Sequence, residues 1–327
     1  KELELDFSIN LAGIGRFRAN AYFQKGMASG TFRYIPDKVM SIDELRLPDV
    51  CHAFAKLRQG FVLVTGPTGT GKSTTLAAII KEINETRQEH IVTVEDPIEF
   101  IHESKKSFVT QRELGGDTKS WDNSLRSVLR QDPNVVFIGE MRDPATMQAA
   151  MTVAETGHLV FSTLHTNSAA GAIPRLIDMK CEPFLIVSTA KVIVAQRLLR
   201  QLSETKEKYT LTTEEVESIG KKIDLDRVMD ALIEEKILEK KADWTKIPLY
   251  KPGKVDKDNS GYAGRLGIHE VLKVSPAIKE LIMQGSNADQ IEDQAKKEGM
   301  LTMLEDGLFK AVQGYTSIEE VLRMVSE

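Results

Sequence analysis

This 327-residue chain has few cysteines, no long apolar run and no excess of positive charge. Its two cysteines, Cys51 and Cys181, are too few for a disulfide framework, and we expect both to be reduced and mostly buried in a cytoplasmic protein. No apolar run approaches the ~20 residues that span a bilayer. The net charge of −5 argues against a nucleic-acid-binding protein, although a local basic patch is compatible with it.

The rest of the composition is ordinary for a globular protein, with 41% hydrophobic and 28% charged residues. The length suffices for one large domain and a smaller one, or for two of ordinary size. The chain starts at Lys1, without an initiator methionine and without a signal peptide. We therefore expect it to begin inside a longer natural protein.

Short apolar runs alternate with helical patterns between residues 59 and 165. This alternation favours an α/β fold with a mostly parallel sheet that has helices on both faces. The expected strands are 60–65, 90–94, 134–138 and 158–163, and the expected helices are 74–87, 120–131 and 145–155.

The flanking segments have a different character. Residues 1–40 read as strands from part of an α+β domain, and residues 41–58 read as a helix with a Ser41–Glu44 capping box, interrupted by Pro48. Residues 203–262 are a Lys- and Glu-rich insert, in which 224–240 fits an amphipathic helix and 251–261 a mobile loop. Short helices are expected from about 275 to 327.

One glycine-rich run carries the main chemical signal. Gly66-Pro67-Thr68-Gly69-Thr70-Gly71-Lys72-Ser73 matches G-x-x-x-x-G-K-[ST] between an expected strand and an expected helix, which is the setting this motif requires. Its backbone N–H groups and the helix N-terminus at Thr74 favour phosphate. We expect Lys72 to bind the outer phosphates and Ser73 to bind Mg²⁺. The setting disfavours a glycine turn without a ligand.

Glu140 follows the expected strand 134–138 through Gly139. The end of a strand near the phosphate loop is where a Walker B acid lies, but the usual Asp is replaced by Gly139. We therefore expect Glu140 to act on Mg²⁺ through a water molecule. The alternative is a strand-end acid that is merely solvated.

Three more acids, Glu95, Asp96 and Glu99, follow the strand 90–94. Clustered carboxylates are costly unless a metal, a water or an arginine uses them, so we expect Glu95 and Asp96 to line the nucleotide site. Glu99 is the candidate that positions or deprotonates the attacking water. The alternative is a polar loop with an Asp cap.

Histidines and arginines complete the candidate set. His158 and His165 flank the last expected strand. They would either sense the γ-phosphate, carry signals between subunits or have a structural role only. Arg126 and Arg130 lie four apart on one face of an expected helix. Arginine neutralises γ-phosphate charge bidentately, although surface charge is the simpler explanation for any single one. Two more, Arg18 and Arg33, would have to arrive from another domain or subunit.

With these residues in place, the chain resembles the secretion ATPase superfamily, the motors of type IV pili and type II secretion. Four family boxes occur in order. They are the Walker A loop at 66–73, the Asp box at 93–100, the atypical Walker B box ending Ile138-Gly139-Glu140, and the His box at 158–165.

The resemblance implies a domain plan and an assembly. Residues 1–45 would be part of a PAS-like domain, 46–58 a linker helix, and 59–327 a RecA-like ATPase domain with the insert at 203–262 and a helical subdomain at 275–327. A cytoplasmic homo-hexamer would bind ATP and Mg²⁺ between the two domains. It would act on a polytopic inner-membrane platform protein and bind no nucleic acid.

The resemblance also implies residue roles. Glu99 matches the water-positioning Glu and Glu140 the Walker B Glu. The arginines that approach ATP from the N-terminal domain match Arg18 and Arg33, and a second pair matches Arg126 and Arg130.

Different segments of the chain resemble motors that work in opposite directions. Residues 15–21 and 102–106 resemble retraction ATPases, whereas 181–186, 196–200, 264–270 and 299–307 resemble assembly and secretion ATPases. We predict an assembly motor, with retraction as the alternative. The four zinc-binding cysteines of many assembly members are missing after residue 200, so no zinc is expected there. More distant alternatives are a RecA-like nucleic-acid motor and a small-molecule kinase.

Overall fold

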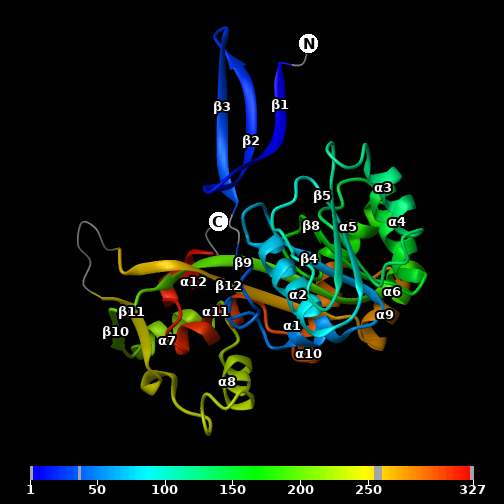
Figure 1. Ribbon diagram of the computed structural model, residues 1–327. Helices are drawn as coiled ribbons and strands as arrows, with labels where there is room; N and C mark the ends of the chain where they lie inside the picture. Colours follow the sequence, from blue (N-terminus) through cyan, green and yellow to red (C-terminus); the bar gives the residue numbers. More distant parts are fainter. Residues whose placement is uncertain (1–2, 36–37, 254–259, 325–327) are drawn as a thin grey trace. The chain divides into compact units, whose positions relative to one another are not determined.

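The computed structural model describes residues 3–35, 38–253 and 260–324 (Figure 1). Unit 1 comprises Lys1–Val64, Lys72–Leu164 and Leu176–Lys191, and unit 2 comprises Thr65–Gly71, His165–Arg175 and Val192–Glu327. Part of the loop expected at 251–261 lies outside the described residues. Among the helices of the described ranges, none is long and apolar enough to cross a membrane.

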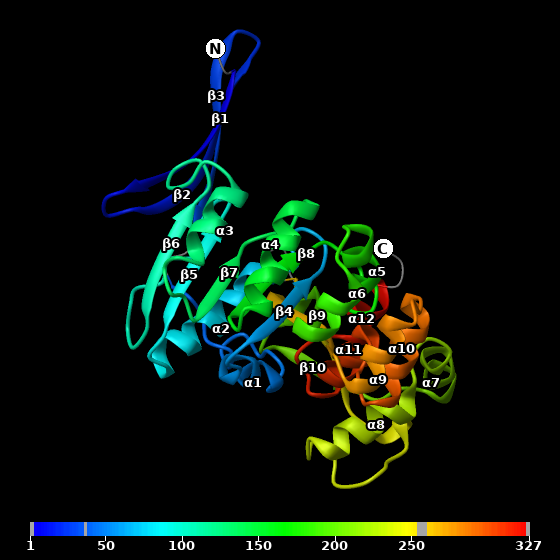
Figure 2. The same ribbon diagram turned by 90° about the vertical axis from the view of Figure 1, so that its right-hand side faces the viewer.

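Unit 1 contains a parallel sheet with the strand order β4-β8-β7-β5-β6, and Figure 2 shows β6, β5 and β7 side by side. β4, β7 and β8 are buried along their whole length, so both of their faces are covered. This confirms the α/β fold with a mostly parallel sheet. The strands are β4 (Gly60–Thr65), β5 (His90–Glu95), β6 (Phe108–Glu113), β7 (Val135–Ile138) and β8 (Leu159–Leu164).

The helices of unit 1 begin where their sequences provide caps. The Ser120 side chain accepts from the Asn123 N–H, and Asp143 accepts from the Thr146 N–H. The helices are α1 (Val50–Lys56), α2 (Lys72–Thr86), α3 (Trp121–Val128), α4 (Pro144–Glu155) and α6 (Pro183–Thr189). The expected helix over 41–58 is wrong in its first part. The Ser41–Glu44 capping hydrogen bonds form, but residues 42–46 make turns and the helix starts only at Val50, after Pro48.

An antiparallel sheet opens unit 1, formed by β1 (Glu4–Leu11), β2 (Gly15–Gln24) and β3 (Met27–Ile35). Its register separates two faces, because side chains alternate along each strand. Phe7, Ala19 and Phe32 lie in one row on the apolar face, whereas Ser8, Arg18 and Arg33 lie in one row on the polar face.

Unit 2 contains β12 (Tyr262–Lys273) and, from Val192 on, β9 (Ala190–Leu202), which form a long antiparallel pair. Figure 2 shows α9, α10 and α11 gathered near one another. α11 contacts β12, α12 and α8. The other elements of unit 2 are β10 (Lys206–Tyr209), α7 (Thr213–Gly220), α8 (Leu225–Glu234), η1 (Trp244–Lys246), β11 (Leu249–Pro252), α9 (Pro276–Met283), α10 (Ala288–Lys297), α11 (Met303–Val312) and α12 (Ile318–Arg323). The helix α5 (Ala172–Asp178) begins in unit 2 and ends in unit 1.

The charged insert is ordered wherever the structure describes it. Val228 and Leu232 of α8 are fully buried. Arg227 donates from Nε to Glu305 Oε1 at 3.0 Å and from Nη1 to the Lys296 carbonyl oxygen at 2.6 Å. These bonds attach the insert to the C-terminal helices, so its charge does not make it a loose loop.

Candidate functional site

The phosphate-loop residues Thr65–Gly71 belong to unit 2. Gly69 and Gly71 have φ values of +83° and +85°, which side chains with a Cβ rarely adopt. The Thr70 hydroxyl donates to the Pro67 carbonyl oxygen at 2.9 Å, which closes the loop on itself. The Thr166 N–H donates to Thr65 Oγ1 at 2.9 Å, so the start of the loop is attached to the segment after the His box.

Lys72 is the first residue of α2 and belongs to unit 1. It is only 8% exposed, and burial lowers the pKa of its ammonium group, while the charges of Glu140 and Glu99 oppose that shift. The structure therefore brings the three residues close enough to interact electrostatically. A buried cation at a helix N-terminus with two acids near it is a site prepared for phosphate and for the chemistry of its outer oxygens.

Glu140 lies half-buried just after β7, as the sequence predicts. The Arg142 Nε donates to Glu140 Oε2 at 2.7 Å, and its guanidinium is 3.7 Å from Asp96 Oδ2. The carboxylate of Glu140 raises the pKa of Arg142 further. Arg142 was not among the predicted site residues, although its position two residues after Glu140 indicated it.

The atypical glycine before Glu140 has a steric explanation. A Cβ at Gly139 would lie 3.3 Å from Glu95 Cα and 3.4 Å from the Val94 carbonyl oxygen, which leaves little room for a side chain. The Thr163 hydroxyl donates to the Gly139 carbonyl oxygen at 2.7 Å. Neighbouring strands thus fix the backbone that presents Glu140.

Glu95, at the end of β5, is 6% exposed. Burial raises its pKa to about 7, despite the hydrogen bond from the Thr93 hydroxyl at 2.7 Å. Gln111 Nε2 donates to Glu95 Oε1 at 3.3 Å, and the Glu99 N–H donates to its Oε2 at 3.4 Å. Glu95 therefore holds the backbone of the exposed Glu99. Gln111 was not predicted as a site residue, because the edge strand that carries it was not recognised.

We expect Glu95→Gln to raise the free energy of unfolding more at pH 8 than at pH 5. The folded pKa of about 7 exceeds the ordinary glutamate pKa of 4.5, so the folded state keeps a proton that the unfolded chain releases. Stability is therefore present below 4.5 and is lost as pH rises toward 7, by about 3 kcal/mol. Urea unfolding at both pH values measures the change, with the exposed Glu155→Gln as control. An equal effect at both pH values would contradict the interpretation.

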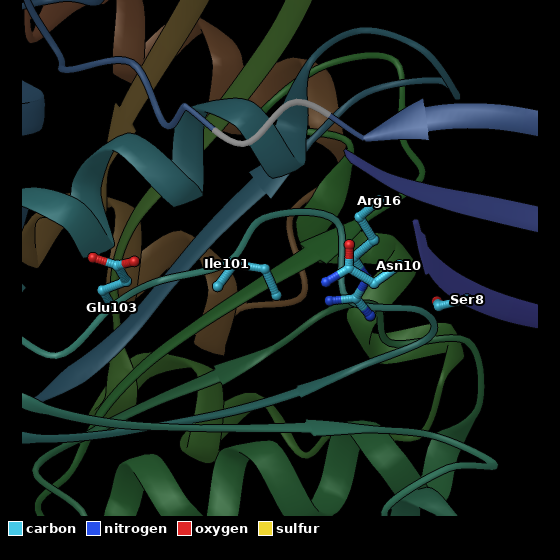
Figure 3. Close-up of a pocket in the computed structure, with 5 residues that line it drawn as sticks. All are labelled: Ser8, Asn10, Arg16, Ile101 and Glu103. Carbon is cyan, nitrogen blue, oxygen red and sulfur yellow. The ribbon is translucent and has the colours of Figure 1, made fainter. Parts of the chain in front are cut away.

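The polar face of the N-terminal sheet meets the end of β6 in unit 1. Glu113 accepts from Arg16 Nη2 at 2.8 Å, from the Ser8 hydroxyl at 3.1 Å and from the Ile98 N–H at 3.0 Å. Ser8 and Arg16 also line a cavity of about 560 Å³. Figure 3 shows the side chains around it. Its lining residues are Ser8, Asn10, Arg16, Ile101 and Glu103.

The predicted arginines have different surroundings. Arg18 and Arg33 are paired directly opposite each other on β2 and β3. Arg126 is exposed and pairs with Asp122 at 2.9 Å. Arg130 lies beyond the end of α3 at Val128, so the prediction that Arg126 and Arg130 share a helix face is wrong. The helix ends early because the chain turns at Leu129 and Arg130.

The two histidines of the His box lie at the opposite ends of β8. A ring nitrogen of His158, Nδ1, is 2.9 Å from the Val153 carbonyl oxygen and 3.1 Å from the Thr156 hydroxyl, which attaches it to the end of α4. His165 is exposed and begins the second segment of unit 2.

Comparison with known proteins identifies the family. Residues 39–323 match the family described as type II/IV secretion system protein. The chain belongs to this family, within the secretion ATPase superfamily. It is 54% identical over 179 residues to the twitching motility protein of Neisseria gonorrhoeae, which covers 55% of this chain and 48% of that protein. It is 42% identical over 269 residues to type II secretion system protein E of Xanthomonas campestris, covering 82% of this chain and 44% of that protein.

The solved structures agree with this family. The crystal structure of the pilus retraction motor PilT with bound ADP superposes with a TM-score of 0.74 and 33% identity, covering 98% of this chain and 77% of that chain. The chain spans about half the length of the curated relatives it matches.

Proposed function

We propose that this chain is the ATP-hydrolysing subunit of a motor for type IV pilus or type II secretion pseudopilus assembly. The observation that carries the proposal is the buried Lys72 at the start of α2, with the charges of Glu140 and Glu99 near it. In this proposal the protein works as a cytoplasmic homo-hexamer on a polytopic inner-membrane platform protein. Membership of the family supports these partners. The proposal includes the domain plan of a PAS-like segment before a RecA-like domain.

Each residue near Lys72 has a separate task in the proposed reaction. The loop Gly66–Thr74 binds the phosphates, and Lys72 neutralises their outer oxygens. Glu99, held through its N–H by Glu95, orients the attacking water. Arg142 holds the Glu140 carboxylate in place through its 2.7 Å hydrogen bond.

The donor set fits Mg²⁺. A serine hydroxyl at the helix start and one nearby carboxylate are the oxygen ligands that this ion combines with phosphates and water. We propose that Ser73 binds Mg²⁺ directly and that Glu140 does so through water, where the ion would neutralise charge on the transferring phosphoryl group. In the described ranges no group of three or more His, Cys, Asp or Glu is arranged as a metal site, and a phosphate-bound Mg²⁺ does not require one.

The pairing of Arg18 with Arg33 supports a role in phosphate binding. Like charges directly opposite each other on a sheet are destabilising, so an anion between them would relieve the repulsion. We propose that they approach the γ-phosphate, and that Arg126, Arg130, His158 and His165 serve the same site or its neighbours in the ring.

The test of this function is ATP turnover by the purified chain, with and without single-stranded DNA, combined with mass measurement. We expect Mg²⁺-dependent hydrolysis that DNA leaves unchanged and that rises with assembly. Strong stimulation by DNA, or a fully active monomer, would instead favour a nucleic-acid motor or a kinase.

Retraction is the second candidate, and the 54% identity to the twitching motility protein favours it. The matches to type II secretion system proteins E and to the pilus assembly ATPase of Pseudomonas aeruginosa are lower in identity but cover 82–84% of this chain. Complementation separates the two directions. Rescue of surface pili in an assembly-null strain supports assembly, whereas rescue of retraction alone supports the second candidate.

A further inference from the structure

Gln196 of β9 lies against both glycine ends of the phosphate loop within unit 2. Its Nε2 donates to the Thr70 carbonyl oxygen at 2.7 Å, and the residue is only 2% exposed. This bond joins residues that are 126 positions apart in the chain. A buried side-chain amide on a loop carbonyl is a strong constraint, because breaking it leaves a buried polar group without its partner.

Two glycines of the loop lie very close to Gln196. A Cβ at Gly66 would lie 2.5 Å from the Gln196 carbonyl oxygen, and a Cβ at Gly71 would lie 3.0 Å from Gln196 Nε2. The first contact is with backbone, so no side-chain movement would relieve it. Gly66 is therefore needed for the approach of the Gln196 backbone, and Gly71 leaves room for the Gln196 amide where it binds the loop.

The surroundings of Gln196 keep its side chain in place. His269 lies directly opposite it in the β9–β12 register. A Cβ at Gly267 would lie 3.7 Å from Gln196 Nε2, and 2.8 Å from the His269 ring. Lys310 in turn binds the Gly267 carbonyl oxygen at 2.8 Å, which holds β12 beside the glutamine.

We propose that Gln196 is a positioning residue that holds the phosphate loop in its nucleotide-binding conformation. It acts through the Thr70 carbonyl and does not itself touch the reacting atoms. The inference rests on the proposed ATP-binding function of the loop.

The test compares Gln196→Glu and Gln196→Leu with the unsubstituted chain, and with Gln201→Glu on the same strand as control. At pH 8 the new carboxylate accepts hydrogen bonds only, so it cannot bind the Thr70 carbonyl. We expect KM for ATP and Kd for MgADP to rise about tenfold or more in both Gln196 variants, with a smaller change in kcat. The control should stay within twofold.

A pH series separates positioning from a general structural role. When protonated, the carboxyl group of Gln196→Glu becomes a donor again, so its KM relative to the unsubstituted chain should fall as pH decreases from 8 to 6. The Gln196→Leu ratio should stay constant. Equal ratios for both variants at every pH, or a KM within twofold of the unsubstituted chain, would overturn the proposal.

The two hypotheses fail in different ways. An unsubstituted chain that binds MgADP but does not hydrolyse ATP contradicts the proposed function, and the Kd comparison still decides the role of Gln196. An unsubstituted chain that binds no nucleotide overturns both.

Discussion

Glu140→Gln is expected to reduce kcat for ATP hydrolysis by at least about 100-fold while ATP binding is retained. The amide keeps the shape of the side chain, and its oxygen still accepts the hydrogen bond that Arg142 donates at 2.7 Å. What disappears is the negative charge near Lys72. Loss of that charge favours an anionic ligand, so Kd for MgATP should be unchanged or lower.

Single-turnover hydrolysis and equilibrium binding measure the two effects separately. Glu155→Gln, on the exposed end of α4, is the matched control and should hydrolyse ATP at the unsubstituted rate. Turnover above a tenth of the unsubstituted value in Glu140→Gln would show that the catalytic acid lies elsewhere, with Glu99 as the next candidate.

The parallel sheet could be predicted because its strands are short, apolar and buried on both faces. β4, β5, β7 and β8 begin and end within about two residues of the expected positions. β6 was missed because its residues Thr110, Gln111, Arg112 and Glu113 are polar and an edge strand has less apolar surface to bury.

Two long strands were missed as well, because they are stabilised by tertiary contacts that a local sequence pattern does not reveal. β9 and β12 carry charged residues among apolar ones, so neither was recognised, although they form the longest ladder. Residues 1–40 were read as strands, and β3 pairs with β2 along its length although it contains Gly30.

The candidate site residues could be predicted where their position next to a strand or helix end in the sequence indicates them. Lys72, Glu140 and Glu95 lie at the ends of elements that the sequence locates, and the structure brings Lys72 within the electrostatic influence of Glu140 and Glu99. Gln196 and Glu113 were not predictable as site residues, because each acts through a contact about a hundred positions away in the sequence.

Lys310→Met is expected to lower the free energy of unfolding by about 3–5 kcal/mol. The Lys310 side chain is 7% exposed, and its ammonium nitrogen lies 2.7 Å from Asp306 Oδ2 and 2.8 Å from the Gly267 carbonyl oxygen. Methionine fills a similar volume but leaves the Asp306 carboxylate without its buried counter-charge, which is what makes the loss large. In the unsubstituted chain, burial and then the Lys310 charge lower the pKa of the neighbouring His269 well below its usual value. Burial, the larger cause, remains in the variant, so we expect His269 to stay neutral at pH 7 and not to replace the lost cation.

Urea unfolding at pH 7 measures this loss, with the exposed Lys297→Met of α10 as control, expected within about 0.5 kcal/mol of the unsubstituted chain. Adding Asp306→Leu to Lys310→Met should restore at least half of the lost stability, because the unpaired charge is then gone. Recovery should remain incomplete, since the His269 N–H loses the Asp306 oxygen that it binds at 2.8 Å. A loss below about 1 kcal/mol in the single variant would mean that water reaches the Asp306 carboxylate and that the pair does not hold α11 against β12.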